Sequence, residues 1–326
     1  MATYKEIKGI KIQSLSSDPP APFIGEVWYN SSSETIKYRQ GATSAAWASG
    51  GALNTARTSL AGCGTQTAGL AFGGDDSGGN SDATEEYNGT AWTNGGNLPL
   101  AKFSMSGVGT QTAGLAFGGN SPGTPNPQVN VSTEEYNGSS WTAGGAMSNR
   151  MSSGAGSGTQ TAALGFGGQG DPPVNTTEEY NGSSWTSGGA MTTGRSDLAG
   201  AGTQTAGLAF GGNNPVTGIT EEYNGSSWTN GGTMGTARYG LGNAGTQTAG
   251  LAFGGSPGFK DNTESYDGSS WTATATMISG RRQLGGCGAS NTSALAFGGS
   301  NPTPLNSVTE EFTGALPAAT RTVGTN

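Results

Sequence analysis

The sequence predicts an all-β fold made of six copies of one four-stranded unit, and three observations lead to this prediction. First, a TAGLAFGG segment ending in a Gly pair is followed, several residues later, by TEEYNGSSWT. Second, the Trp residues of these segments are 45, 49, 44, 43 and 43 residues apart. Third, Gly makes up 61 of 326 residues and charged residues only 11%, which favours short strands and tight turns. A repeat of roughly 40–50 residues with several strands is typical of a β-propeller blade. The repeated Trp residues, which we expect to be structural, are Trp47, Trp92, Trp141, Trp185, Trp228 and Trp271.

Residues 1–44 do not follow the repeat and are expected to form a short N-terminal β-hairpin arm. Strands are predicted at 26–29 and 35–39, joined by an Asn-Ser-Ser-Ser turn. The DPPAP segment before them is typical of an extended spacer. An arm this short has no core of its own, so it must pack on the rest of the protein or on a partner chain. Alternatively, the arm only covers one edge of the ring of repeats.

The second repeat illustrates the strand order expected in every copy. Its first strand starts at Lys102, and a Thr-Gln-Thr turn leads to AGLAFGG, in which alternate residues share one face. A variable loop at 120–132 precedes the third strand, STEEY. Asn137-Gly138 is predicted to form a type I′ hairpin turn, which needs positive φ at both central residues. The outermost strand then begins at Trp141.

A basic residue recurs at the start of the first strand, and a Glu pair recurs in the third. The cations could surround an anionic ligand, or each could pair with a Glu of its own repeat. The second interpretation is favoured because both partners recur together. The basic residues are Arg57, Lys102, Arg150, Arg195, Arg238 and Arg281. The Glu pairs are Glu85-Glu86, Glu134-Glu135, Glu178-Glu179, Glu221-Glu222 and Glu310-Glu311.

The two ends of the repeat array predict how the propeller, assigned to residues 45–326, closes. The last repeat has TEEF at 309–312 but no Trp after it, whereas Trp47 precedes the first complete repeat. The strand around Trp47 is therefore expected to complete the sixth blade, which removes exposed sheet edges. The segment TIKYR at 35–39 competes with TEEF for the place beside Trp47, and TEEF is favoured.

The two cysteines occupy the same position of the first strand in repeats one and six. In a closed ring these repeats are neighbours, so Cys63 and Cys287 are expected to lie near each other beside the channel. Whether they form a disulfide stays open, because equivalent atoms of adjacent blades can exceed the Cα separation of about 7 Å that a disulfide allows.

The Gly pair, the Tyr five residues before the Trp, and the basic residue that opens the next repeat resemble kelch repeats over about residues 47–314. This resemblance implies a six-bladed kelch-like β-propeller. It implies little about activity, because propellers host enzymes, lectins and scaffolds.

Composition argues against an enzyme. The chain has no His, which excludes a Ser-His-Asp triad, a Cys-His pair and His-ligated metals. Adjacent Glu residues in a strand point to opposite faces and are poorly placed for joint acid–base catalysis. The segment 267–271 faintly resembles the Asp box of sialidases, but its spacing differs. We therefore expect no catalytic residue, no cofactor and no metal.

Charge and hydropathy restrict the partners. A net charge of −8 argues against binding to nucleic acid, which needs a basic face. No apolar run is long enough to span a membrane, and the N-terminus lacks the apolar segment of a signal peptide. Synthesis in a cytoplasm is expected, with any release occurring by lysis.

The loops between the second and third strands differ in length and composition, and all six should emerge on one face. Binding residues concentrate on variable loops held by a rigid scaffold. These loops are 75–83, 120–132, 169–176, 213–219, 256–262 and 300–308. The candidate contact residues are Asp75, Asp76, Asn126, Pro127, Gln128, Phe259 and Lys260. Phe259 could stack on a sugar or only pack within its loop. Asp75, Asp76 and Asp82 could bind calcium, but a solvated acidic loop is the simpler interpretation.

The segment GEVWYNSSSETIKY resembles tail, baseplate and fibre proteins of bacteriophages, and the GTQTAGLAFGG repeats are similar to structural proteins of marine phages. The resemblance implies a virion protein of tail-fibre type. Its arm would attach to other virion proteins through Val27, Trp28 and Tyr29. Its propeller would face a host glycan or receptor. The alternatives are a capsid or tail decoration protein and a cellular kelch-type scaffold. A homo-oligomer stays open.

Overall fold

The computed structural model describes residues 12–121, 130–169, 173–302 and 305–323, which form strands and no helix. The chain divides into two compact units, each described here by itself. The arm unit comprises Met1–Ala45 and Ala315–Asn326, and the repeat body comprises Ala46–Gly314. The assignment of residues 315–326 to the arm unit differs from the sequence-based boundary, which placed them in the propeller. Within the described ranges, nothing helical is long and apolar enough to cross a membrane.

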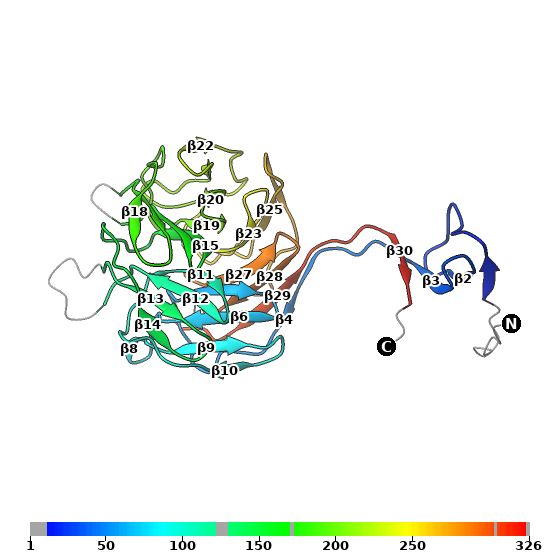
Figure 1. Ribbon diagram of the computed structural model, residues 1–326, viewed down its shortest axis with the longest axis horizontal. Helices are drawn as coiled ribbons and strands as arrows, with labels where there is room; N and C mark the ends of the chain where they lie inside the picture. Colours follow the sequence, from blue (N-terminus) through cyan, green and yellow to red (C-terminus); the bar gives the residue numbers. More distant parts are fainter. Residues whose placement is uncertain (1–11, 122–129, 170–172, 303–304, 324–326) are drawn as a thin grey trace. The chain divides into compact units, whose positions relative to one another are not determined.

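The repeat body contains six four-stranded antiparallel sheets in its described part, one for each sequence repeat (Figure 1). Repeat 1 contains β5 (Ala61–Thr65), β6 (Ala68–Phe72), β9 (Thr84–Tyr87) and β10 (Trp92–Asn94). Repeat 2 contains β11 (Ser106–Thr110), β12 (Ala113–Phe117), β13 (Thr133–Tyr136) and β14 (Trp141–Ala143). Repeat 3 contains β15 (Ala155–Thr159), β16 (Ala162–Phe166), β17 (Thr177–Tyr180) and β18 (Trp185–Ser187).

The other three sheets follow the same order. Repeat 4 contains β19 (Ala199–Gly202), β20 (Gly207–Phe210), β21 (Thr220–Tyr223) and β22 (Trp228–Asn230). Repeat 5 contains β23 (Gly242–Thr246), β24 (Ala249–Phe253), β25 (Thr263–Tyr266) and β26 (Trp271–Ala273). Repeat 6 contains β27 (Gly285–Ser290), β28 (Ser293–Phe297), β29 (Thr309–Thr313) and β4 (Ala46–Ser49). The all-β prediction is confirmed, and repeated sheets of this kind are consistent with a β-propeller.

Strand β4 belongs to the sheet of repeat 6 although it precedes repeat 1 in the chain. It pairs antiparallel with β29, and Trp47 lies opposite Phe312. The predicted pairing of TEEF with the strand around Trp47 is therefore confirmed. The competing TIKYR segment lies in the arm unit, where it forms most of β3 (Thr35–Gln40).

The last hairpin turn of repeats 1–5 differs from the predicted type I′ turn. Tyr136 pairs with Trp141, so four residues connect the strands of repeat 2. Gly138 has a positive φ of 89°, but Asn137 does not. Instead the Oδ1 of Asn137 accepts hydrogen bonds from the backbone N–H groups of Ser139 and Ser140. The Asn side chain therefore caps a four-residue loop, as Asn commonly does in turns.

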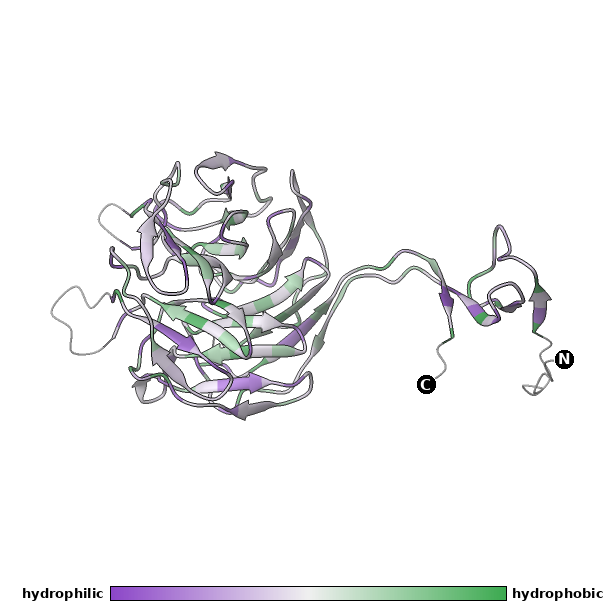
Figure 2. Ribbon diagram, in the orientation of Figure 1, coloured by the Kyte–Doolittle hydropathy of each residue, from purple (hydrophilic) through white to green (hydrophobic). Residues whose placement is uncertain are grey.

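Each repeat is joined to the preceding one by its Trp. The indole of Trp141, in repeat 2, donates to the Oγ1 of Thr84 at 2.9 Å and packs on Phe72 with ring centroids 4.9 Å apart. The same bond joins Trp92 of repeat 1 to Thr309 of repeat 6. The hydrophobic colouring gathers on the inner strands, while the third strand β9 is largely hydrophilic (Figure 2). The Trp residues thus contact the preceding repeat through both a hydrogen bond and ring packing.

A Tyr–Glu hydrogen bond forms a second link between repeats. The hydroxyl of Tyr136 donates to the Oε1 of Glu86 in the preceding repeat at 2.6 Å. Tyr87 makes the same bond to Glu311 of repeat 6. The other three bonds join Tyr180 to Glu135, Tyr223 to Glu179 and Tyr266 to Glu222. The second Glu of each pair therefore serves the next repeat and not its own.

These bonds predict alkaline instability. Burial and the neighbouring carboxylate raise the pKa of Tyr87, Tyr136, Tyr180, Tyr223 and Tyr266 to about 12. An unfolded Tyr has a pKa of about 10. Because the folded pKa is the higher, this stabilisation is complete below pH ~10 and is lost as the pH rises toward ~12. Tyrosinate absorbance and circular dichroism, recorded together, should show unfolding coupled to titration in this window. In Tyr136→Phe, the high-pH absorbance change should shrink, whereas titration of all tyrosines near pH ~10 in a folded protein would contradict the prediction.

The junction of repeats 5 and 6 replaces this link with another. Phe312 stands where the other repeats have Tyr, and Ser265 stands where the preceding repeat would supply Glu. Asn291, in the position of the turn Gln, donates to the Oγ of Ser265 at 3.0 Å and to the carbonyl of Tyr266. Three sequence changes that lie far apart in the chain thus meet at one interface.

Buried ion pairs form within repeats, as the favoured interpretation predicts. Arg195 and Glu221 are both fully buried, with Nη2 and Oε1 2.9 Å apart. The guanidinium also donates to the carbonyls of Gly211 and Ile219, while Glu221 accepts from the backbone of Thr192. The corresponding pairs are Arg57–Glu85, Lys102–Glu134, Arg238–Glu264 and Arg281–Glu310. They bind the third strand to the segment that enters the first.

Repeat 3 departs from this pattern, and the assignment of Arg150 to the series of buried cations is wrong. Arg150 is exposed, and the buried position is taken by Met151, whose carbonyl accepts from Gly119 as that of Lys102 does from Gly74. Glu178 stays buried and has no ion-pair partner among the described residues. It keeps the two backbone N–H hydrogen bonds that the paired Glu residues also accept, as Glu85 and Glu264 do.

The replacement of the buried cation by Met151 is accompanied by a second change at Gly154, a position where the other repeats have Leu or Met. A Cβ on Gly154 would lie 2.7 Å from the Sδ of Met151, so the Met side chain fills the space of the missing side chain. Repeat 3 has therefore exchanged an ion pair for apolar packing, with two coordinated changes.

This exchange predicts strong coupling between the two positions. Met151→Arg alone places a cation beside Glu178 but leaves a void next to Gly154, and Gly154→Leu alone collides with Met151. The double variant restores the arrangement of the other repeats, so we expect a coupling energy of about 1–3 kcal/mol in its favour. Urea unfolding of the four proteins of this cycle measures it, and simple additivity would refute the exchange.

The arm unit has a four-stranded sheet of order β1-β2-β3-β30. Besides β3 it contains β1 (Gln13–Leu15), β2 (Val27–Asn30) and β30 (Ala319–Thr322). β1 runs parallel to β2, and β3 pairs antiparallel with both β2 and β30. The predicted hairpin is confirmed, but both ends of the chain contribute strands to this sheet.

Candidate functional site

Six residues at equivalent positions, one from each repeat, are joined in a cycle of backbone hydrogen bonds. We call them the hexad: Ser59, Ser104, Ser153, Asp197, Gly240 and Gln283. Each N–H donates to the carbonyl of the preceding member, and Ser59 donates to Gln283, at N–O distances of 2.7 to 2.9 Å. The cycle uses the backbone groups of all six members, which leaves their side chains for other contacts.

The hexad residues have an unusual backbone conformation. Asp197 has a φ of 52°, the three Ser residues and Gln283 have φ between 51° and 53°, and Gly240 has 57°. This left-handed region is uncommon for residues other than Gly, and it costs on the order of 1 kcal/mol or more per residue. Five non-Gly residues keep this conformation, so the cycle constrains each of them strongly.

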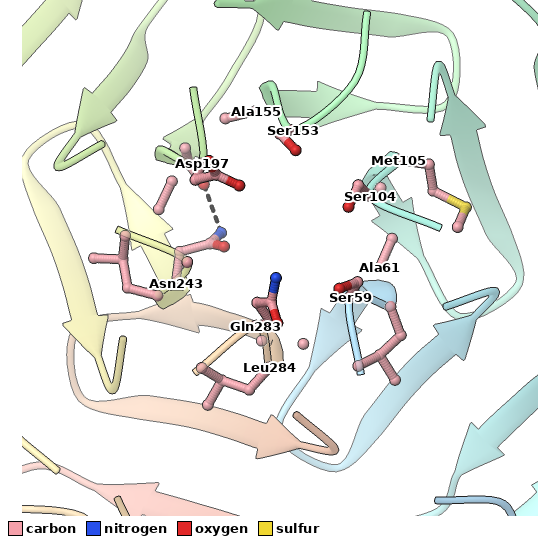
Figure 3. A pocket seen from close by; sticks show the side chains of 18 of the residues that line it. Ser59, Ala61, Ser104, Met105, Ser153, Ala155, Asp197, Asn243, Gln283 and Leu284 are labelled. Carbon is pink, nitrogen blue, oxygen red and sulfur yellow. Dashed lines mark hydrogen bonds between the residues drawn. The ribbon is translucent and has the colours of Figure 1, made fainter. Parts of the chain in front are cut away.

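The hexad surrounds a cavity of about 130 Å³ (Figure 3). The first strands of all six repeats contribute to its lining. Ser59, Ser104, Ser153, Asp197 and Gln283 place hydroxyl, carboxylate and amide groups around the opening. A belt of buried apolar side chains also lines it, formed by Leu60, Met105, Leu198, Leu241 and Leu284. The cavity thus combines a polar ring with an apolar lining, as small-molecule sites often do.

Asp197 gives the hexad its only charge. Its Oδ2 accepts a hydrogen bond from the hydroxyl of Ser196 at 3.1 Å. Partial burial raises the pKa of Asp197, while hydrogen bonds from Ser196 and Ser153 oppose this effect. On its other side stands Gly240, where the ring has no side chain. The carboxylate is therefore partly buried and lies next to a hexad position that has no side chain.

A second cavity of about 130 Å³ adjoins the first. Glycines line both cavities: Gly62, Gly107, Gly156, Gly200 and Gly286. A Cβ on Gly62 would lie 2.3 Å from Phe297 of repeat 6, so the packing of Phe requires Gly here. Asn243 is the exception, and its Nδ2 donates to the carbonyl of Gly200. It is the polar side chain at the base of the site.

The variable loops lie beside the segments that carry the hexad. Thr58, next to Ser59, exchanges backbone hydrogen bonds with Asp75 of the first loop. Equivalent bridges in later repeats join Phe103 to Asn120, Ser196 to Asn213, Tyr239 to Ser256 and Arg282 to Ser300. The variable loops, which the sequence analysis proposed as binding loops, therefore belong to the same surface as the hexad, which that analysis did not identify. We call this surface the loop face.

The first loop forms a small hairpin in the described structure. Asp75 and Asp76 form β7 (Asp75–Asp76), which pairs with β8 (Gly79–Asn80). The Oδ1 of Asp76 accepts from the N–H of Gly78, and burial together with Asp76 raises the pKa of Asp75. Asp82 accepts from Asn97. No group of three metal-ligating side chains occurs among the described residues.

Phe259 makes a specific contact with the next repeat. The guanidinium carbon of Arg282 lies 5.2 Å from the centre of its ring, a cation–π geometry, and the ring remains 39% exposed. Lys260 is partly buried, and its backbone bonds to Gly255 and Arg281. Packing within the loop face therefore accounts for one face of the Phe. Asn126, Pro127 and Gln128 lie outside the described residues.

The proposed attachment residues of the arm differ in exposure. Trp28 is fully buried, and its indole donates to the Oδ1 of Asp18 at 3.1 Å, so its side chain is not available to a partner. Val27 is 41% exposed and Tyr29 is partly buried. Phe23 and Ile24, which the sequence analysis did not single out, are 82% and 74% exposed.

The two cysteines are free thiols at the second cavity. β5 and β27, which carry them, lie side by side. The Sγ of Cys63 faces the carbonyl of Thr110, while that of Cys287 faces Thr65, so both point toward the following repeat. Burial raises the pKa of Cys287 to about 12 and that of Cys63 as well. They act as small apolar residues of the core.

Comparison with known proteins adds no relative: no family model matches the chain, and no curated protein is similar to it.

Proposed function

We propose that this protein is a bacteriophage virion protein of tail-fibre type, built on a closed six-bladed kelch-like β-propeller. Its arm unit attaches to other virion proteins, and its loop face binds a glycan or receptor on the host surface. The cycle of hexad hydrogen bonds and the pairing of β4 with β29 support closure of the six blades.

The binding role is supported by the positions at which the repeats differ from one another. The contacts between repeats recur almost unchanged, as the Trp–Thr bonds illustrate. The hexad reads Ser, Ser, Ser, Asp, Gly and Gln, and the loops beside it vary in length. A constant scaffold that presents unlike residues on one face is the arrangement expected of a binding protein.

The arm unit supports the attachment role. It has its own sheet and exposes Phe23, Ile24 and Val27. The resemblance of GEVWYNSSSETIKY to phage tail and fibre proteins indicates that its partners are virion proteins.

Mass spectrometry of gradient-purified virions tests this proposal. A tail appendage should be detected at far fewer copies than the major capsid protein. Copy numbers comparable to capsid would indicate a decoration protein, and absence from virions would refute the proposal in favour of a cellular scaffold.

Competition for host cells tests the binding role separately. The purified full chain should slow adsorption of the phage, and a Phe259→Ala variant, which alters the loop face, should do so less well. Thr142→Ala on the exposed outer strand β14 is the matched control. Equal competition by all three proteins would place receptor binding elsewhere.

A further inference from the structure

The hexad cavity presents hydrogen-bond acceptors around a single negative charge. Asp197 is the only ionisable side chain among the described residues that line it. Three Ser hydroxyls and the Gln283 amide also line the cavity (Figure 3). A carboxylate has about four acceptor positions, and Ser196 and Ser153 occupy only part of them.

The position of the charge indicates where a ligand enters. Gly240 follows Asp197 in the hexad, and no atom lies closer than 3.5 Å to a Cβ built on it. The atom at this distance is the Cγ of Gln283, so Asp197 and Gln283 flank the one hexad position that has no side chain. A cationic group bound at this position would lie beside the Asp197 carboxylate.

The size and lining of the cavity limit the ligand. Its volume of about 130 Å³ is several times the roughly 10–15 Å³ of cavity that one water molecule needs. The leucines below the ring offer an apolar surface for C–H groups, and the Ser and Gln side chains suit hydroxyls. Such a combination matches a sugar ring better than a bare metal ion.

We propose that the hexad cavity binds the ammonium group of an amino sugar, with Asp197 as the counter-ion. The ammonium group donates to the Asp197 carboxylate, and the sugar hydroxyls bond to Ser104, Ser153 and Gln283. This assignment deepens the proposed function, on which its biological setting rests, by naming the ligand class at the centre of the loop face. Charge-assisted hydrogen bonds are the stronger ones, so the amine dominates selectivity.

Calorimetric titration of the full-length chain tests the assignment. D-glucosamine should bind at least about tenfold more tightly than D-glucose and N-acetyl-D-glucosamine, because neither of these carries the ammonium charge. Asp197→Asn keeps the shape of the side chain and should remove this preference. Asp267→Asn changes an exposed carboxylate of an outer hairpin turn, where the other turns carry Asn, and it is the matched control that should leave the preference unchanged.

Three outcomes would overturn the proposal: no binding of glucosamine, equal binding of glucose, or unchanged selectivity in a folded Asp197→Asn protein. Chemical-shift changes of Gly240 and Asn243 on titration with glucosamine provide a second measurement if the substitution unfolds the protein, and their absence would also overturn it. Selective amine binding by a protein absent from virions would refute only the virion role. Adsorption blocking without amine binding would refute only the amino-sugar site.

Discussion

Removing strand β4 is expected to destabilise the repeat body more than any single substitution. We compare two truncated proteins, residues 46–314 and residues 51–314, which differ by β4 and the residue after it. Within β4, the indole N–H of Trp47 donates to the Oγ1 of Thr263. The Trp47 ring also packs on Phe253 and Phe312, with ring centroids 5.1 Å apart in both cases. Loss of such a side chain costs about 3–5 kcal/mol, and the β29 ladder is lost in addition.

Truncation at residue 51 should also change the association state. The open edge of β29 is a template for pairing with another chain. Residues 46–314 should therefore be monomeric with a cooperative urea transition, and residues 51–314 should unfold at lower urea and self-associate in sedimentation. Identical transitions and masses for the two proteins would show that β4 does not close the body.

The second large effect is expected at the buried ion pairs. In Arg195→Met the carboxylate of Glu221 stays fully buried without its cation, and the carbonyls of Gly211 and Ile219 lose a donor. Breaking a buried pair by removing one partner costs about 3–5 kcal/mol. Urea unfolding monitored by Trp fluorescence should show this loss.

A matched control separates burial from charge. Arg282→Met removes the Arg that follows the buried Arg281 in the chain. Arg282 is only partly buried, and its guanidinium contacts the ring of Phe259. Its loss should cost less than about 1 kcal/mol, the usual value of a cation–π contact at an exposed site. Equal effects of the two substitutions would contradict a special role of the buried pairs.

Much of the fold is readable in the sequence because its signals are local. Alternating apolar residues, Gly pairs and Asn-Gly turns act over a few residues, and they predicted the strand order of each repeat. The mistaken assignment of Arg150 shows the limit of this approach. The Arg lies one residue from the buried position, and only the packing of Met151 against Gly154 identifies which residue occupies it.

The candidate site was missed for a related reason. The hexad residues lie two positions after the buried cation, or after Met151 in repeat 3, and they are Ser in three repeats but Asp, Gly and Gln in the others. Aligning the repeats at that cation would have marked this position as one where they differ. Their common role comes from a cycle of backbone bonds that sequence patterns do not encode.

The sequence by itself determined an all-β chain of repeated four-stranded units, a distinct N-terminal hairpin and the pairing of TEEF with the Trp47 strand. These follow from periodicity and turn chemistry, which depend on neighbouring residues. Only the tertiary structure decided that β30 joins the arm sheet, that Ser265, Asn291 and Phe312 meet at one junction, and that the six hexad residues surround one cavity. These depend on register between segments distant in the chain, which is set by the packing of whole sheets.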